Sequence, residues 1–457
     1  MAPVASPTLD LARFASDLRL GDIPEATRER VLACVADAIA CAAFGRDQPT
    51  SRVVTEWVRR TGGRRESSVW GTPVRVPAGN AALALGTMTH AFDLDDYHNS
   101  KTHPGAVIVP AALALAEARG ATGMRAVEAI VAGYEVMIRV SLAAGPAATR
   151  MRGWHPTGVF GPLGAAAASA HVLGLDERAT ASALGLAGTQ SGGVWAFTAD
   201  GSQSKRFHPG RAGQSGILAA ELSELGFAGP TRVLEATDGG LLAALSPDAV
   251  PELAVADLGT VFHGGEMAIK PYAACGSLHS AVDALLALKK ESDLEVERVR
   301  SIVLRTSSVV VRQCGFPFEP LSVLQAQMSA QYVLAVSLLD GACQVGQFAS
   351  HRLRDPVVLD LARPVEVRAD PEVERDYPAR FAGVVDVSLD DGRCLTRRVD
   401  DPKGSAASPL SEAELREKFR SLAEPVYGVS RAGRVYALAT QLHELKSVRD
   451  LTALLAM

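Results

Sequence analysis

Long helical runs built largely from alanine and glycine constrain this sequence more than any other feature. Apolar residues recur at helical spacing through residues 31–43, 106–118, 126–140, 163–173 and 179–187. Because alanine and glycine are small, these segments predict helices that approach one another closely in a buried bundle. Hydrophobic residues make up 47% of the chain and aromatic residues only 5%, a composition typical of a globular protein packed from such helices.

The residue pattern of the sequence changes near Lys270. Residues 299–311 and 384–389 are rich in β-branched residues, which predicts strands. Asp391 and Gly392 form a hairpin signal before a further strand at residues 394–399. With a helical segment near residues 326–339, this region is predicted to be an α+β unit.

Helical patterns return after residue 403. Ser411 and Glu414 have the spacing of a capping box, and the helical pattern continues through residues 435–445. We therefore predict a mainly α protein with two domains. Residues 1–265 and 403–457 form a discontinuous helical domain, and residues 266–402 form the smaller α+β domain.

Charge and cysteine spacing exclude several classes of function. The 457-residue chain has a net charge of −5 and lacks the basic excess of a nucleic-acid-binding protein. No run of about 18 apolar residues predicts a membrane span, and the N-terminus lacks a signal-peptide pattern, so we expect a cytoplasmic protein. The six cysteines form no CxxC pair, which argues against a zinc ribbon or an iron–sulfur cluster.

The densest group of titratable residues lies in the segment of residues 90–103. The group consists of His90, Asp93, Asp95, Asp96, Tyr97, His98, Lys101 and His103. A helix is predicted to follow at once, and the free N–H groups of a helix start favour a bound anion. Carboxylates and imidazoles also bind metal ions, but no standard ligand spacing such as HExxH is present, so we predict no metal.

Two further segments bring basic side chains to predicted helix starts. His155 precedes an alanine-rich helix, although a lone histidine is more often a packed core residue. Before another predicted helix lie four basic residues: Lys205, Arg206, His208 and Arg211. Because cations at a helix start oppose the helix dipole unless an anion is also present, this group predicts a cradle for a carboxylate.

A fourth segment lies where the helical part meets the α+β part. It contains Lys270, Tyr272, Cys275 and His279. Junctions between domains are common places for clefts, which makes this a candidate substrate-binding segment. Cys275 alone suggests a nucleophile, but a single cysteine is more often buried and inert.

These four segments, in this order, resemble the signature stretches of the MmgE/PrpD family. The resemblance runs roughly from Asp10 to Leu455 and is carried by HPGAVIVPAALALAE, GWHPTGVFGPLGAAAA, SKRFHPGRA and KPYAACGSLH. It implies a helical domain built from both ends of the chain, a smaller α+β lid, a cleft between them and a homodimer. It also implies an enzyme without metal or cofactor that acts on small di- or tricarboxylic acids.

The family includes 2-methylcitrate dehydratases, cis-aconitate decarboxylases and an iminodisuccinate epimerase, which all move a proton at a carbon next to a carboxylate. Its functional positions match Asp93, His103, His155, Lys205, Lys270 and Cys275. Two residues depart from the family pattern. Tyr97 stands where several members have Thr, and Cys275 stands where the decarboxylase branch has His, which counts against decarboxylation.

We therefore predict a cofactor-independent lyase of the 2-methylcitrate dehydratase type, which takes a proton next to a carboxylate and expels water. His103, oriented by Asp93, is the expected base. His155 or Tyr97 is the expected acid, and Lys205 stabilises the developing negative charge.

The predicted substrate-binding residues are Lys270, Cys275, His208, Arg211 and His279. Two alternatives to dehydration use the same groups on a related acid, namely decarboxylation and epimerisation. A third alternative is a polycarboxylate-binding protein that has lost catalysis.

Overall fold

The structure is a computed structural model that describes residues 6–292, 294–319 and 321–457. Most of these residues lie in helices and the sheets are small, so the prediction of a mainly α protein is confirmed. The chain divides into two compact units. Unit 1 comprises the described residues up to Trp195, Ser204–Ile269 and Ser411–Met457, and unit 2 comprises Ala196–Gln203 and the described residues of 270–410.

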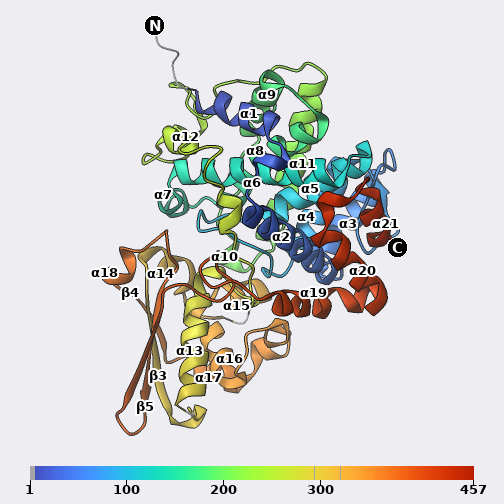
Figure 1. Cartoon of the computed structure of the whole chain (residues 1–457). Coiled ribbons are helices and arrows are strands. Elements are labelled where there is room, and N and C mark those ends of the chain that lie inside the picture. The colour runs from blue at the N-terminus through green and yellow to red at the C-terminus, as the bar shows by residue number, and fades with distance from the viewer. Residues whose placement is uncertain (1–5, 293, 320) are drawn as a thin grey trace. The chain divides into compact units, whose positions relative to one another are not determined.

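Unit 1 is helical except for loops and a small ribbon of β1 (Ser67–Ser68) and β2 (Arg75–Val76) (Figure 1). Its helices before the second unit are α1 (Pro7–Asp17), α2 (Glu25–Gly45), α3 (Pro49–Thr61), α4 (Ala78–Thr89), α5 (Pro104–Arg119), α6 (Gly123–Ala144), α7 (Pro146–Met151), α8 (Pro156–Leu173), α9 (Glu177–Gly188), α11 (Ser204–Glu224) and α12 (Leu241–Leu245). Short 3-10 turns are η1 (Leu20–Asp22), η2 (Pro251–Ala254) and η3 (His263–Glu266). The five helical runs expected from the sequence lie within α2, α5, α6, α8 and α9, which confirms them.

Helix α8 is buried along almost its whole length and packs against α5, α6, α9 and α11. Small residues set the spacing of these helices. A Cβ atom added to Gly164 would lie 2.7 Å from the carbonyl oxygen of Gly133 in α6, and one added to Gly216 would lie 2.4 Å from the Cβ of Ala165. Glycine is therefore required where α8 meets its neighbours, as the small-residue pattern predicts.

The C-terminal helices return to unit 1. They are α19 (Glu412–Tyr427), α20 (Val429–Thr440), the turn η8 (Leu442–Glu444) and α21 (Arg449–Leu455). The capping box of Ser411 and Glu414 is present at the start of α19. Lys418 of α19 forms an ion pair of 2.5 Å with buried Asp37 of α2 and donates a hydrogen bond of 2.8 Å to the carbonyl of Leu94.

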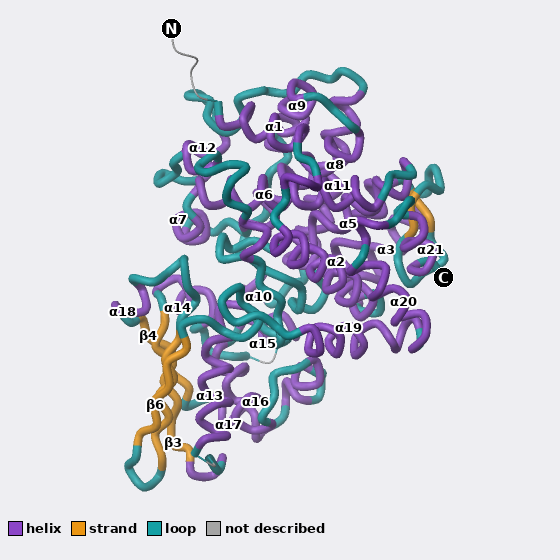
Figure 2. The backbone as a smooth tube through the Cα atoms, in the orientation of Figure 1, coloured by secondary structure: helices purple, strands orange, loops and turns teal. Residues whose placement is uncertain are grey.

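Unit 2 contains a four-stranded sheet with the order β4-β3-β5-β6, drawn in orange in Figure 2. The strands are β3 (Val299–Thr306), β4 (Val365–Ala369), β5 (Gly383–Leu389) and β6 (Cys394–Val399). β3 pairs with β4 in parallel and with β5 antiparallel, and β5 and β6 form the expected hairpin at Asp391 and Gly392. Helix α13 (His279–Glu291) packs against β5 and β6.

The remaining elements of unit 2 are α10 (Phe197–Asp200), α14 (Ser308–Cys314), α15 (Val323–Met328), α16 (Ala330–Asp340), α17 (Pro356–Ala362), α18 (Pro371–Glu374) and the 3-10 turns η4 (Gly276–Leu278), η5 (Val296–Arg298), η6 (Val345–Phe348) and η7 (Arg352–Arg354). The strand expected over residues 299–311 was too long, because β3 ends at Thr306. Ser307 caps α14 by accepting a hydrogen bond from the N–H of Val310, which turns the following valines into helix.

Among the described residues, no helix has the length and apolar character that crossing a membrane requires.

The contact between α4 and α11 gives a stability prediction. A Cβ atom on Gly210 would lie 2.2 Å from the carbonyl oxygen of Leu83 and 2.7 Å from the Thr87 hydroxyl. Gly210→Ala should therefore lower the free energy of unfolding by about 1–3 kcal/mol, as measured by chemical denaturation. Gly433→Ala is the matched control, because a Cβ there meets no described atom within 4 Å and should change stability by at most about 1 kcal/mol. Equal denaturation midpoints for the two variants would contradict the close approach.

Candidate functional site

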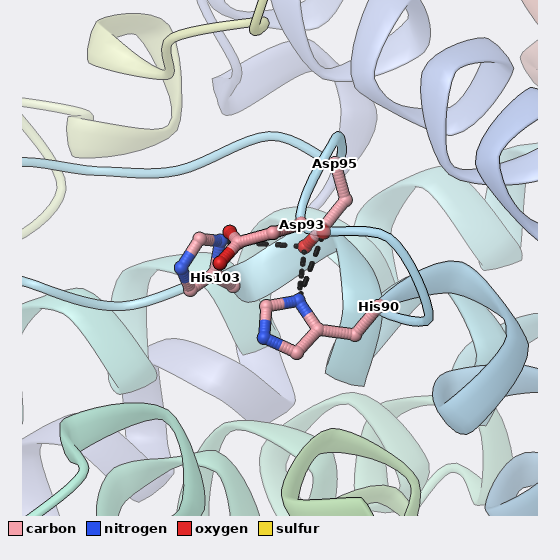
Figure 3. A group of neighbouring side chains, drawn as sticks. All are labelled: His90, Asp93, Asp95 and His103. Atoms are coloured by element: carbon pink, nitrogen blue, oxygen red, sulfur yellow. Dashed lines mark hydrogen bonds and ion pairs between the residues drawn. The ribbon is translucent and has the colours of Figure 1, made fainter. Parts of the chain in front are cut away.

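The loop between α4 and α5 brings four titratable side chains together. The ring nitrogens of His90 and His103 and the carboxylate oxygens of Asp93 and Asp95 include one atom from each residue that all lie within 4.8 Å of one another (Figure 3). The side chain of His103 is 13% exposed, whereas those of His90 and Asp95 are 0% and 1% exposed. His103 is therefore the member of the cluster that an incoming molecule reaches first.

Asp95 links the two histidines. Its carboxylate accepts a hydrogen bond of 2.8 Å from Nδ1 of His90 and lies 3.3 Å from Nδ1 of His103. The structure thus gives His103 a different close carboxylate partner from the predicted one, Asp93. Asp95 sits two residues further along the same loop, and the predicted role of Asp93 in orienting His103 stays a prediction.

The hydrogen bonds of His103 fix its tautomer. Nδ1 lies 2.9 Å from the backbone carbonyl oxygen of Asp96, and a carbonyl oxygen can only accept a hydrogen bond. Nδ1 therefore carries the hydrogen, and the lone pair of the neutral ring is at Nε2. This arrangement leaves Nε2 as the atom of His103 that can take or give a proton.

Burial and nearby charges set the protonation states of His90 and Asp95. Burial, together with the charges of Lys205 and His103, lowers the pKa of His90 to about 3 against the opposing effect of Asp95. Burial alone would raise the pKa of Asp95, but His90 and His103 outweigh it and hold that pKa well below its usual range. At neutral pH the site therefore contains a neutral His90 and an ionised Asp95.

Asp93 holds the loop to the start of α11. Its carboxylate forms a buried ion pair with Lys205, and Arg206 lies 3.5 Å from the same oxygen. Arg206 also donates a hydrogen bond of 3.2 Å to the carbonyl of His90. The backbone of Asp93 has φ of 55°, a left-handed conformation that costs free energy and is common at functional sites.

Helix α11 begins earlier than expected. Lys205, Arg206, His208 and Arg211 were placed before the helix, but α11 starts at Ser204 and contains them all. Cations in the first turn are tolerated because the carboxylate of Asp93, from another segment, supplies the missing anion. The four residues do not form one cradle, since Arg211 is exposed, bonds to Gln214 and lies on a different face from Lys205.

Three helices begin next to this cluster. His103 is the N-cap residue of α5, His155 is the N-cap residue of α8, and Lys205 is the second residue of α11. The ring centroid of His90 lies 4.6 Å from the ring centroid of His103 and 6.4 Å from the ring centroid of His155. Because the N-terminus of a helix carries partial positive charge, the three starts together favour a bound anion.

His155 and His208 form a pair at the edge of the cluster. Their Nδ1 atoms are 2.8 Å apart, so one ring donates and the other accepts. Burial, followed by nearby charge, lowers the pKa of His155 well below its usual value and that of His208 to about 4. Both rings are therefore neutral at pH 7. His208 and Arg211 also line a cavity of about 310 Å³ between α8, α11 and the loop that follows α9.

Asp96 closes the start of α5 from inside the protein. Its carboxyl accepts hydrogen bonds of 2.9 Å from the N–H of Gly105 and 3.0 Å from the hydroxyl of Tyr134. Gly105 has to be glycine, because a Cβ atom there would lie 2.3 Å from the carboxyl oxygen. Burial, with the charges of Asp37 and Asp95, raises the pKa of Asp96 to about 8, so this carboxyl is protonated at neutral pH.

The four clustered residues are also the types that hold metal ions. In the structure, however, Asp93 is neutralised by Lys205 and Arg206, and Asp95 already accepts from His90. A cation would have to displace these partners from a buried position. The geometry favours a metal-free site, and the absence of metal stays a prediction.

A second group of similar residues lies nearby in unit 1. His98 is 3.2 Å and His263 is 2.9 Å from the same carboxylate oxygen of Glu266. Nδ1 of His98 accepts a hydrogen bond of 3.0 Å from the N–H of Ser100, so its Nε2 carries the hydrogen that faces Glu266. A metal at Nε2 would require the opposite tautomer, which the Ser100 N–H opposes. We interpret this group as a structural tether of the segment before unit 2.

Tyr97 is buried in the same loop, and its backbone forms two hydrogen bonds with Ala268, of 2.9 Å and 2.8 Å. Its predicted role as an acid stays a prediction. His90 and Asp95 belong to the dense segment of residues 90–103, but neither had a predicted role. The available signal was their residue type and their spacing of five within one short loop.

Three predicted binding residues belong to unit 2. Lys270 is fully buried, and the Sγ of Cys275 accepts a hydrogen bond of 3.0 Å from the side-chain amide of Gln313. His279 begins α13, and its Nε2 lies 3.2 Å from the carbonyl oxygen of Ala274. Their assignment to the substrate stays a prediction.

Comparison with known proteins identifies relatives over nearly the whole chain. Residues 9–254 match the MmgE/PrpD N-terminal domain, and residues 272–444 match the MmgE/PrpD C-terminal domain. The chain is 30% identical over 469 residues to a cis-aconitate decarboxylase of Aspergillus terreus, covering 98% of this chain and 95% of the relative. It is also 30% identical to the human cis-aconitate decarboxylase (98% and 94%) and 28% identical to the mouse protein (98% and 93%).

The raised pKa of Asp96 gives a pH prediction. Between the ordinary value of 3.8 and about 8, the folded protein holds a proton at Asp96 that the unfolded chain releases. The free energy of unfolding should therefore fall as pH rises through that range, by up to about 1.4 kcal/mol per pH unit for this one group. Asp96→Asn should remove this slope when unfolding is measured from pH 5 to pH 8. Asp360→Asn, whose side chain is 68% exposed, is the control and should leave the slope unchanged. Parallel curves for Asp96→Asn and wild type would refute a protonated Asp96.

Proposed function

Because this chain belongs to the MmgE/PrpD family, we propose that it is a lyase acting on a small tricarboxylate, with decarboxylation of cis-aconitate or a close analogue as its reaction. The observation that carries the proposal is the state of His103. Its Nδ1 is committed to the Asp96 carbonyl and to Asp95, and its side chain is the most exposed of the three residues His90, Asp95 and His103. Nε2 is thus available for one proton transfer to substrate.

In this reaction the bond between a carbon and its carboxylate breaks, and carbon dioxide leaves. The electron pair left behind makes the remaining carbon skeleton basic, and the protonated Nε2 of His103 gives it a proton. Asp95 stabilises the imidazolium before the transfer through its contact with Nδ1. A proton from solvent then restores the imidazolium.

The surrounding charges suit a substrate with several carboxylates. Lys205 and Arg206 bring two cations to the cluster, and the single carboxylate of Asp93 contacts both of them. The starts of α5, α8 and α11 add partial positive charge at the same place. We assign Lys205 to carboxylate binding and to stabilising the negative charge that develops during the reaction.

Dehydration of a 2-methylcitrate-like acid is the second candidate. The residue that favours it is Cys275, because the family resemblance implies a His at this position in the decarboxylase branch. In that reaction the neutral Nε2 of His103 takes the proton next to a carboxylate, and hydroxide leaves with a proton from His155 or Tyr97. We rank decarboxylation first because the relatives with the reported identities are named as cis-aconitate decarboxylases.

The other sequence predictions are kept as proposals. Lys270 and Cys275 are proposed substrate-binding residues on the strength of the family resemblance. His208, Arg211 and His279 are proposed because they lie in the basic segment and the junction segment that the sequence predicts to bind a carboxylate. The homodimer, the cytoplasmic location and the absence of any cofactor also stay predictions.

The function is tested by following cis-aconitate, citrate, 2-methylcitrate and iminodisuccinate by NMR in deuterated buffer. Decarboxylation predicts release of carbon dioxide from cis-aconitate, with one solvent deuteron in the product. Alkene formation from citrate or 2-methylcitrate would establish dehydration instead, and deuterium uptake without net conversion would indicate an epimerase. Calorimetric binding without any turnover would support a binding protein.

The same assay should separate His103 from other histidines. His103→Ala should lower kcat by about 10² to 10⁴-fold and change binding much less, because it removes the proton donor and leaves the cations in place. His443→Ala is the control, since His443 lies in η8 with its ring near Glu444, and it should keep wild-type kcat. Near-normal turnover of His103→Ala would return His103 to a structural role.

Exhaustive chelation tests whether the site works without a metal ion. Activity should survive dialysis against EDTA, because Asp93 and Asp95 are satisfied by Lys205 and by the histidines. Metal content should be measured in the same sample, so that retained activity is not due to retained metal. Loss of activity that one particular metal restores would make the clustered residues ligands and would overturn the proposed roles of Asp93 and Asp95.

A further inference from the structure

The carboxylate of Asp95 links His90 to His103. Both rings direct Nδ1 toward its carboxylate, at 2.8 Å and 3.3 Å. Figure 3 shows the three side chains arranged with Asp95 between the rings. Loss of the hydrogen bond from His90 would therefore alter the charge and orientation of the Asp95 carboxylate, which contacts His103.

His90 is poorly explained by packing alone. Its side chain is fully buried, and its Nε2 makes no hydrogen bond within the part of the chain that the structure describes. A buried nitrogen without a partner reduces stability, and an apolar residue of similar size would avoid that loss. The hydrogen bond from Nδ1 to Asp95 is what an apolar residue could not supply.

We propose that His90 is a positioning residue that acts on His103 through Asp95, by keeping the Asp95 carboxylate ionised and oriented. The inference rests on the proposed role of His103 in proton transfer. As a neutral donor, His90 stabilises the negative charge of Asp95 without competing for the proton that His103 carries. Asp95 then remains a carboxylate over the pH range in which the enzyme works.

Other charged groups also act on Asp95, and they come from four elements. The groups around Asp95 are His90, Asp96 and His103 in its own loop, Arg206 in α11, Lys418 in α19 and Cys41 in α2. Asp96 and Cys41 carry no positive charge, and Arg206 and Lys418 are each paired with another aspartate. His90 is thus the neighbour whose removal takes away a hydrogen bond to Asp95 and leaves the other ion pairs intact.

Two variants of His90 distinguish the effect of its hydrogen bond to Asp95 from the effect of its side-chain volume. His90→Asn places an amide N–H where Nδ1 stands and keeps the donor, whereas His90→Leu removes it. In His90→Leu the pKa of Asp95 should rise, because the stabilising donor is lost. The acid limb of the kcat/KM profile should then move to higher pH, and kcat should fall by about 10 to 10²-fold with little change in KM. His90→Asn should restore the wild-type acid limb.

His171 provides a matched control for the cost of losing a buried histidine. It is also fully buried and also faces a carboxylate, Glu128 at 3.1 Å. It lies sixteen residues from His155 along α8, which is roughly 24 Å. His171→Leu should lower the melting temperature but leave the acid limb in place. A shift of the limb in both leucine variants would show that destabilisation, not His90, moves the profile, and would overturn the proposal.

A second measurement does not depend on turnover. The carboxyl carbon of Asp95, identified by comparison with Asp95→Asn, can be titrated by NMR in protein labelled at aspartate. In wild type and in His90→Asn, the chemical shift of this carbon should stay at the value of an ionised carboxylate at every pH at which the protein is folded. In His90→Leu, the chemical shift should change with pH as the carboxylate takes up a proton. An unchanged Asp95 signal in His90→Leu would overturn the proposal even if the enzyme is active. A changed signal supports it even if none of the tested acids is the substrate.

Discussion

The buried ion pair of Asp93 with Lys205 is the interaction on which the site depends. It joins the loop after α4 to the first turn of α11, two segments 112 residues apart in the sequence. It supplies the anion that a helix start with two cations requires, and it holds Asp93 in a costly left-handed conformation. Removal of one partner would leave a buried charge uncompensated, at a cost of about 3–5 kcal/mol. The loop is therefore ordered before any substrate arrives.

The packing of the helices explains why titratable residues from several segments are concentrated here. Glycine and alanine let α4, α5, α8 and α11 approach closely, so that three helix starts can meet at one point. Each start delivers a polar residue to that point: His103, His155 or Lys205. The surrounding bundle is apolar, which strengthens the charges inside it and shifts the pKa values of His90 and Asp96 away from their ordinary range. Fold and electrostatics are thus consequences of the same small-residue pattern.

Local patterns predicted the helices, the hairpin and the segment that carries the cluster, because these depend on neighbouring residues. They could not predict partners from distant segments. The start of α11 was misplaced because its compensating anion, Asp93, lies far away in the sequence. The close contact of His103 with Asp95 was missed because both aspartates are of the same type and two residues apart. The end of β3 was misjudged because the cap at Ser307 outweighs the β-branched valines after it.

The contact of Lys418 with Asp37 and with the carbonyl of Leu94 has a consequence for synthesis. Lys418 is added to the growing chain tens of seconds after Leu94, at the usual rate of translation. Until it emerges, the ion pair of Lys418 with Asp37 cannot form, and the loop lacks one of its anchors. A nascent chain stopped before α19 would therefore contain all the helices of unit 1 from α1 to α12 and still lack this anchor of the loop between α4 and α5.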